Sequence, residues 1–133
     1  MTVVISDITT KSWSINVSAL GEIVADTEDV KQCVMLIVTT VQGTVPFLPE
    51  FGCGIYNHID RPAQSAAPLM IREVRNAVAK WEQRASVINS SYEIQQSLIN
   101  ITLELRMNSA RGTDPVSSFF INFTLDTETG IFS

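Results

Sequence analysis

The residues best suited to covalent chemistry lie in one short stretch, residues 45–62, VPFLPEFGCGIYNHIDRP. It contains Cys53 and, five positions later, His58, the only histidine in the sequence. A thiol beside a histidine is the minimum for a cysteine nucleophile with its general base, and Asp60 would add a third donor for a metal ion. No oxyanion motif or orienting partner accompanies the pair, and structural zinc prefers four ligands with paired spacing. We therefore expect a structural cysteine near a surface histidine, with no metal and no cofactor.

Carboxyl groups offer a second route to catalysis, because glycoside hydrolases use two of them as acid and nucleophile. Such a pair needs surroundings that separate the two pKa values, and the sequence points to no particular pair. A small cell-wall glycan hydrolase stays open as an alternative function. Phosphate-binding glycine motifs are absent from the sequence, and GCG at 52–54 indicates only a flexible bend. The carboxyl candidates are Glu22, Asp26, Glu50 and Asp60.

Backbone-shaping residues dominate the same stretch, which predicts a loop between two helices. Pro49 fixes the backbone and Phe51 offers a large apolar ring. Gly52 and Gly54 permit a positive φ or the close approach of another chain. The loop therefore favours fit to a partner over catalysis. Its candidate partner-binding residues are Pro49, Glu50, Phe51 and Gly52.

The segment WEQR, residues 81–84, is the second candidate for binding. It places Trp81, Glu82 and Arg84 at the end of a predicted helix. Arginine forms two-point contacts with carboxylates and is favoured at interfaces. The spacing alone favours a simpler interpretation, in which Glu82 and Arg84 form a weak ion pair at a solvated helix end.

Two helices should position these segments. The first begins at Asp26 or Thr27, either of which can cap it, and Gly43 is a plausible stop. Its apolar stripe is broad, so it should be buried on more than one side. The second runs from about Ser65 to Glu82, with Pro68 within its first turn. The apolar stripe of the second helix consists of Met70, Val74, Ala77 and Trp81.

Strand patterns occur before and after the helices. Residues 12–19 alternate strictly between apolar and polar, which predicts a half-buried strand. In the last third, segments around 88–94, 98–107 and 118–126 predict an antiparallel meander, with a tight link at 95–97 and a longer polar one at 108–115. The fold class expected is α+β, with the two main helices packed on a small, mainly antiparallel sheet.

The last strand carries apolar residues on both faces. Phe120 points to the side opposite Phe119, Ile121 and Phe123. A strand of this kind is either a slightly irregular core strand or an edge that accepts a partner strand. The pattern alone leaves both interpretations open.

Size and charge restrict the class of protein. The sequence has 133 residues, 45% of them apolar, which suits a single domain: an N-terminal strand or arm at about 1–25, a core at about 26–126 and a C-terminal tail at about 127–133. The net charge of −5, without a basic run, argues against nucleic acid as a partner. The sequence predicts no membrane span and no secretory signal, so we expect a cytosolic protein with free thiols at Cys33 and Cys53.

The order of these pieces resembles the baseplate wedge proteins of contractile-tailed phages, which are related to the phage W protein and to the corresponding baseplate component of type VI secretion systems. The matching stretch runs from about Glu28 to Leu125. It contains the Pro-Glu-Phe-Gly loop at 49–52, IDRP at 59–62, and a long helix that ends in EQR, where the family has Glu-Pro-Arg.

The sequence departs from the family pattern at two points. Gln83 replaces the proline of the signature, which could let the helix extend by about a residue. Gly43 and Thr44 stand where the family has Gly-Glu. The charged members of the signature, Glu82 and Arg84, are present.

The resemblance implies a non-enzymatic, sheath-domain-like subunit in the baseplate of a viral tail, assembled in the host cytoplasm. Its implied partners are other wedge proteins, the tail sheath protein and the tail tube. Trp81, Glu82 and Arg84 would contact the wedge core, and the last strand would initiate the sheath by strand pairing. Some relatives are labelled lysozymes, an activity that no residues here support. An unrelated α+β protein-binding module is a further alternative. The implied strand-pairing residues are Ser118, Phe120, Asn122 and Thr124.

Overall fold

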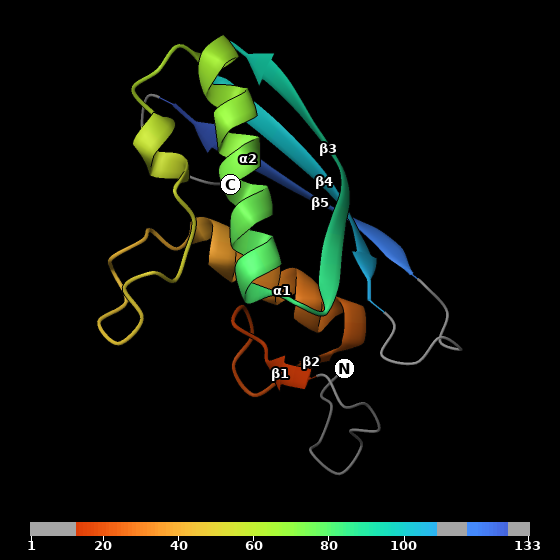
Figure 1. The fold of residues 1–133 in the computed structure, drawn as a ribbon. Coiled ribbons are helices and arrows are strands. Elements are labelled where there is room, and N and C mark those ends of the chain that lie inside the picture. Colours follow the sequence, from red (N-terminus) through yellow and green to blue (C-terminus); the bar gives the residue numbers. More distant parts are fainter. Residues whose placement is uncertain (1–12, 109–116, 128–133) are drawn as a thin grey trace.

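The computed structural model describes residues 13–108 and 117–127, which form an α+β fold (Figure 1). The link expected at 108–115 therefore lies almost wholly outside the described residues. In chain order the elements are β1 (Trp13–Ile15), β2 (Ile23–Ala25), α1 (Asp26–Thr39), the short 3-10 helix η2 (Ile55–His58), α2 (Ala63–Trp81), β3 (Ala85–Gln95), β4 (Leu98–Met107) and β5 (Ser118–Asp126).

The predicted fold class and meander are confirmed. The strands β3, β4 and β5 form an antiparallel sheet in that order, and β1 pairs with β2 in a separate hairpin. Helix α2 lies along one face of the larger sheet, while α1 crosses at its lower end next to the hairpin (Figure 1). Alternate residues of β4 and β5 point towards the helices and are buried, as their period of two predicts. These residues are Ile99, Ile101, Leu103, Leu105, Phe119, Ile121, Phe123 and Leu125.

Helix α1 contributes its apolar stripe to the core, through Val30, Val34, Ile37 and Val38. Its ends differ from the expectation. The helix begins at Asp26 itself, and no side chain caps it. It also ends well before Gly43, because Thr40 turns into an extended conformation.

Helix α2 buries the stripe expected of it, apart from Trp81, which is half-buried. It begins two residues earlier than predicted, at Ala63, so Pro68 occupies the sixth position instead of the first turn. There the ring removes one N–H that would otherwise bond to the carbonyl of Gln64. The helix ends at Trp81, so Gln83 does not extend it.

The N-terminal strand is shorter than expected and belongs to a hairpin whose second strand, β2, the pattern did not predict. Its apolar side chains are not half-buried, because Trp13, Ile15 and Val17 are all exposed. The Gln32 side chain of α1 lies along the outer edge of β1. Its Nε2 donates to the Ile15 carbonyl at 2.8 Å, and its Oε1 accepts from the Val17 amide at 3.0 Å.

The stretch 45–62 is a loop that contains the 3-10 helix η2, a short regular element that the sequence pattern did not predict. Gly52 has a φ of +115°, and a Cβ at this position would collide with the Thr40 carbonyl oxygen. The close approach expected at Gly52 thus comes from the chain itself, where the Cys53 amide donates to that carbonyl at 3.0 Å. The expected surface position of His58 is wrong, because its side chain is mostly buried, with Nε2 3.6 Å from Glu73 Oε1.

Candidate functional site

Two of the segments expected to bind partners lie against each other: the loop around Phe51 and the end of α2. The rings of Phe51 and Trp81 meet edge to face, with centroids 5.1 Å apart and planes inclined at 65°, a geometry that aromatic quadrupoles favour. Beside them, Lys80 Nζ lies 2.7 Å from Glu50 Oε2. The hydrogen bond from Lys80 lowers the pKa of the Glu50 carboxyl. Contacts between side chains therefore fix the loop onto the helix.

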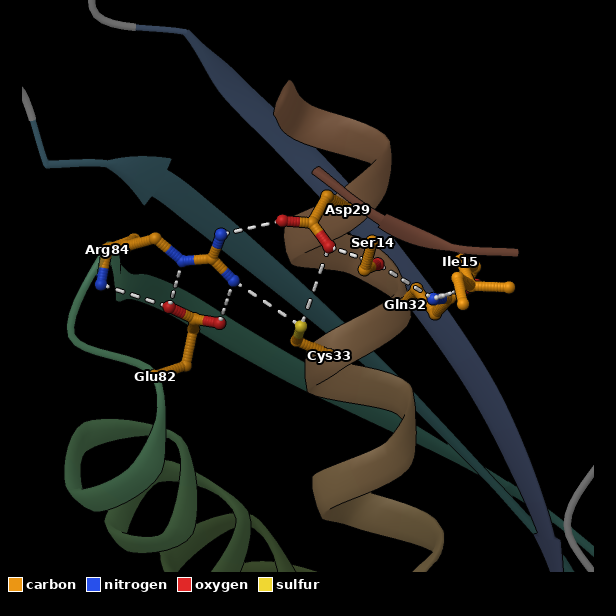
Figure 2. A network of polar contacts seen from close by, with 7 residues as sticks. All are labelled: Ser14, Ile15, Asp29, Gln32, Cys33, Glu82 and Arg84. Carbon is orange, nitrogen blue, oxygen red and sulfur yellow. Dashed lines mark hydrogen bonds and ion pairs between the residues drawn. The ribbon is translucent and has the colours of Figure 1, made fainter. Parts of the chain in front are cut away.

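Arg84 follows the end of α2 and holds Glu82 through three N–H groups (Figure 2). Its Nε donates to Glu82 Oε1 at 2.8 Å, and its Nη2 donates to Oε2 at 2.8 Å. Its backbone N–H also donates to Oε1, at 3.1 Å. A two-point contact of this kind holds the Nε–Nη2 edge of the guanidinium against the carboxylate.

A second carboxylate holds the other end of the guanidinium. Arg84 Nη1 donates to Oδ2 of Asp29 at 2.6 Å, and Nη2 donates to Cys33 Sγ at 3.4 Å. The remaining oxygen of Asp29, Oδ1, accepts from Ser14 Oγ at 2.5 Å. The network thus links the hairpin, α1, the end of α2 and the start of β3 (Figure 2).

The prediction of a weak ion pair at a solvated helix end is wrong. Glu82 is only 4% exposed and Asp29 only 2%, whereas the Arg84 side chain is 37% exposed. The hydrogen bonds to Glu82, and then those to Asp29, raise the pKa of Arg84 above its ordinary value despite partial burial. Arg84 is therefore a permanent cation that neutralises part of a buried acidic pair.

Sequence reasoning missed Asp29 and Cys33 as members of this site. A signal was present, because Asp29, Cys33 and Ile37 are four residues apart and therefore share one helix face. A carboxylate on the buried face of a helix needs a partner, since an unpaired buried charge is costly.

A depression of about 300 Å³ opens beside this network. We call it the Arg84 depression. Its walls are largely apolar, with the exposed Leu36 of α1 on one side and the Phe51–Trp81 pair on another. Pro49 lies exposed in the adjacent loop, and its carbonyl accepts from the Gly43 amide at 2.8 Å. The complete lining is Cys33, Leu36, Ile37, Phe51, Trp81, Glu82 and Arg84.

The groups considered for catalysis lie outside this depression or are poorly suited to reaction. Burial raises the pKa of Cys53 to about 11, so its thiol stays protonated near neutral pH. Glu50 is engaged with Lys80, and both Asp26 and Asp60 are exposed. Glu22 accepts a long hydrogen bond from the Asn16 side chain of the hairpin. Among residues 13–108 and 117–127, no cluster of three potential metal ligands occurs.

Strand β5 presents the other candidate site. Within the described residues, β5 pairs only with β4, so its second edge is open. The Met107 amide donates to the Ser117 carbonyl, and the Thr127 amide donates to the Ser97 carbonyl. Backbone N–H and C=O groups alternate in direction along a strand. In β5, those of the odd-numbered residues therefore point towards β4, and those of the even-numbered residues point away from it, to the second edge. The residues whose backbone groups point to the second edge are Ser118, Phe120, Asn122 and Thr124. In the register with β4, the last three lie opposite Glu104, Thr102 and Asn100.

Phe120 is 60% exposed on the sheet face opposite the core, as its position in the strand predicts.

Neither described helix has the length and apolar character that a bilayer crossing requires.

Comparison with known proteins places this geometry in a family. Residues 24–111, two thirds of the chain, match the family described as baseplate wedge protein gp25. The chain belongs to this family. Members of the baseplate wedge family are structural components of tail baseplates, so the expected baseplate role is confirmed at that level. A search of curated proteins gives no match.

Three solved structures share the fold of the baseplate wedge family. The first, a candidate tail lysozyme from Geobacter sulfurreducens, has 24% identity and a TM-score of 0.61, covering 75% of this chain and 93% of its own. A subunit of the postcontracted pyocin R2 baseplate has 19% identity and a TM-score of 0.63, covering 73% and 99%. One from the type VI secretion baseplate complex has 15% identity and a TM-score of 0.56, covering 73% and 91%.

Proposed function

We propose that this chain is a structural wedge subunit that docks on the wedge core through the Arg84 depression and initiates the tail sheath through β5. The observation that carries the docking role is the position of Arg84. This cation is immobilised by two buried carboxylates, yet part of its side chain faces a depression with apolar walls. Desolvated arginines and aromatic rings at the centre of a patch are the usual anchors of protein interfaces.

The residues of the two segments have different roles in this proposal. Phe51 and Trp81 form the apolar wall against which the partner packs. Glu82 is too buried for extensive contact and instead orients Arg84. The loop residues Pro49, Glu50 and Gly52 hold Phe51 in place, through the bond from Gly43, the ion pair with Lys80 and the contact with Thr40.

Replacing Leu36 with glutamate tests the docking surface. Leu36 is exposed and lines the Arg84 depression, and glutamate suits a helix as well as leucine does, so the chain should fold normally. The buried charge should weaken binding to purified wedge complex by about tenfold or more in a titration.

Ile88→Glu is the matched control, because Ile88 is similarly exposed on β3 and does not line the Arg84 depression. Equal affinities for the two variants would rule out docking through this surface.

Strand pairing with the sheath is proposed from the open edge of β5. The N–H of Asn122 faces away from β4, by the alternation set out above. Proline is tolerated at such an edge position but removes the donor. Asn122→Pro should therefore fold and bind the wedge, and should fail to seed sheath polymerisation as followed by electron microscopy.

Asn122→Ala distinguishes the contribution of the backbone N–H from that of the side chain, because it removes the side-chain amide and keeps the backbone N–H. We expect sheaths of normal number and length with this control. Normal sheath initiation by Asn122→Pro would exclude β5 as the pairing strand.

A further inference from the structure

We propose that Asp29 is a positioning residue of the wedge contact: with Glu82, it aims one N–H of Arg84 Nη1 at an uncharged carbonyl oxygen of the partner. This inference rests on the docking role proposed above for the Arg84 depression. To that docking role it adds Asp29, which lies 55 positions from Arg84 in the sequence. It also adds the chemical class of the partner group that Arg84 recognises.

The argument starts from the donors of the guanidinium, which carries five N–H groups in a rigid plane. Nε and one N–H of Nη2 bind Glu82. The other N–H of Nη2 faces Cys33 Sγ, and one N–H of Nη1 binds Asp29. The second N–H of Nη1 has no protein acceptor in residues 13–108 or 117–127, and it belongs to a side chain that is 37% exposed.

Asp29 fixes the direction of that remaining donor, because both N–H groups of Nη1 lie in the guanidinium plane. Glu82 alone would hold only the opposite edge of the plane. Asp29 is itself fixed, since it lies on α1, is 2% exposed and accepts a hydrogen bond from Ser14. The free donor is thus aimed before any partner arrives, which lowers the ordering cost of binding.

The local charge indicates what the donor recognises. Arg84 contributes one positive charge, and Asp29 and Glu82 contribute two negative ones, so the group carries a net charge of −1. A partner carboxylate would meet two buried like charges at short range, where screening by water is weak. A carbonyl oxygen accepts the same N–H without that repulsion. The last carbonyls of a helix lack partners within the helix. The end of a partner helix that presents such a carbonyl next to apolar side chains would fit this depression.

Variants of Asp29 and Arg84 test the positioning role, with purified wedge complex lacking this subunit as the probe. Asp29→Ala and Arg84→Lys should each weaken binding by about tenfold, and the double variant should be little weaker than either, since both remove one shared interaction. Asp29→Asn keeps an acceptor for Nη1 and should restore wild-type affinity. Circular dichroism at the assay temperature confirms that each variant is folded, so that lost stability is not counted as lost binding.

The outcomes separate this inference from the docking role on which it depends. If Leu36→Glu blocks binding while folded Asp29→Ala binds like the wild type, the docking surface stands and the positioning role is wrong. If Leu36→Glu has no effect, the docking surface itself is wrong. Tighter binding by Asp29→Asn, with strong salt dependence, would identify a carboxylate as the acceptor and overturn the uncharged carbonyl.

Discussion

Replacing Arg84 with alanine is expected to lower the free energy of unfolding by about 3 kcal/mol, because it removes the only cation that pairs with the two buried carboxylates among the described residues. Glu82 and Asp29, which are 4% and 2% exposed in the wild-type structure, would then lack a cationic partner. An uncompensated buried charge costs several times more than a lost surface ion pair. This loss is a large fraction of the total stability of an ordinary domain. Urea denaturation followed by tryptophan fluorescence measures it.

Arg75→Ala is the matched control for this prediction. Arg75 is exposed on the outer side of α2, and alanine favours a helix, so the change should stay within about 0.5 kcal/mol. If Arg84→Ala is as stable as Arg75→Ala, the network in Figure 2 does not hold the fold together. A binding defect in Arg84→Ala can be assigned to the contact itself only after stability has been measured.

Gly52→Ala is expected to destabilise the protein by about 3 kcal/mol, through two effects that add at one position. The φ of +115° is strained for any residue with a side chain, and the new methyl would also collide with the Thr40 carbonyl. Relief of the collision would break the bond from the Cys53 amide to that carbonyl and detach the loop from the end of α1. The midpoint of thermal unfolding should fall accordingly.

Gly43→Ala isolates the first of these effects. Gly43 has a φ of +88°, but a Cβ there would meet nothing within 4 Å. It should therefore cost only about 1 kcal/mol, the strain of a left-handed conformation. Equal losses of stability in Gly43→Ala and Gly52→Ala would show that the collision with Thr40 does not contribute to the destabilisation.

Periodicity predicted the elements that lie over the core. The alternation in residues 98–107 and 118–126 predicted both the strands and their buried faces, because one face of each strand packs on helices. The same alternation placed Phe120 on the outer face. The stripe that includes Met70 and Val74 predicted α2 for the same reason. The loop was predicted from its prolines and glycines, which restrict the backbone locally.

Local patterns failed where distant residues decide the structure. The spacing of Glu82 and Arg84 indicated a surface pair, since their third partner, Asp29, lies far away in sequence. Strand β2 has three residues, too few to show a period. The alternating segment at the N-terminus predicted a buried face, but the hairpin packs edge-on, through polar side chains of α1. His58 is mostly buried and lies against Glu73, 15 positions further along the chain, a contact that no local pattern reveals.

The side-chain amide of Gln32 closes one strand edge of the hairpin. An unpaired strand accepts almost any extended chain, so a protein with several of them can polymerise in the wrong direction. The primary amide of Gln32 imitates one peptide unit of a neighbouring strand and occupies β1 between Ile15 and Val17. Growth by strand addition is thereby discouraged at the hairpin. Under the proposed strand pairing, the outer edge of β1 is closed to a partner, whereas β5 and β3 each keep one edge that no described strand occupies.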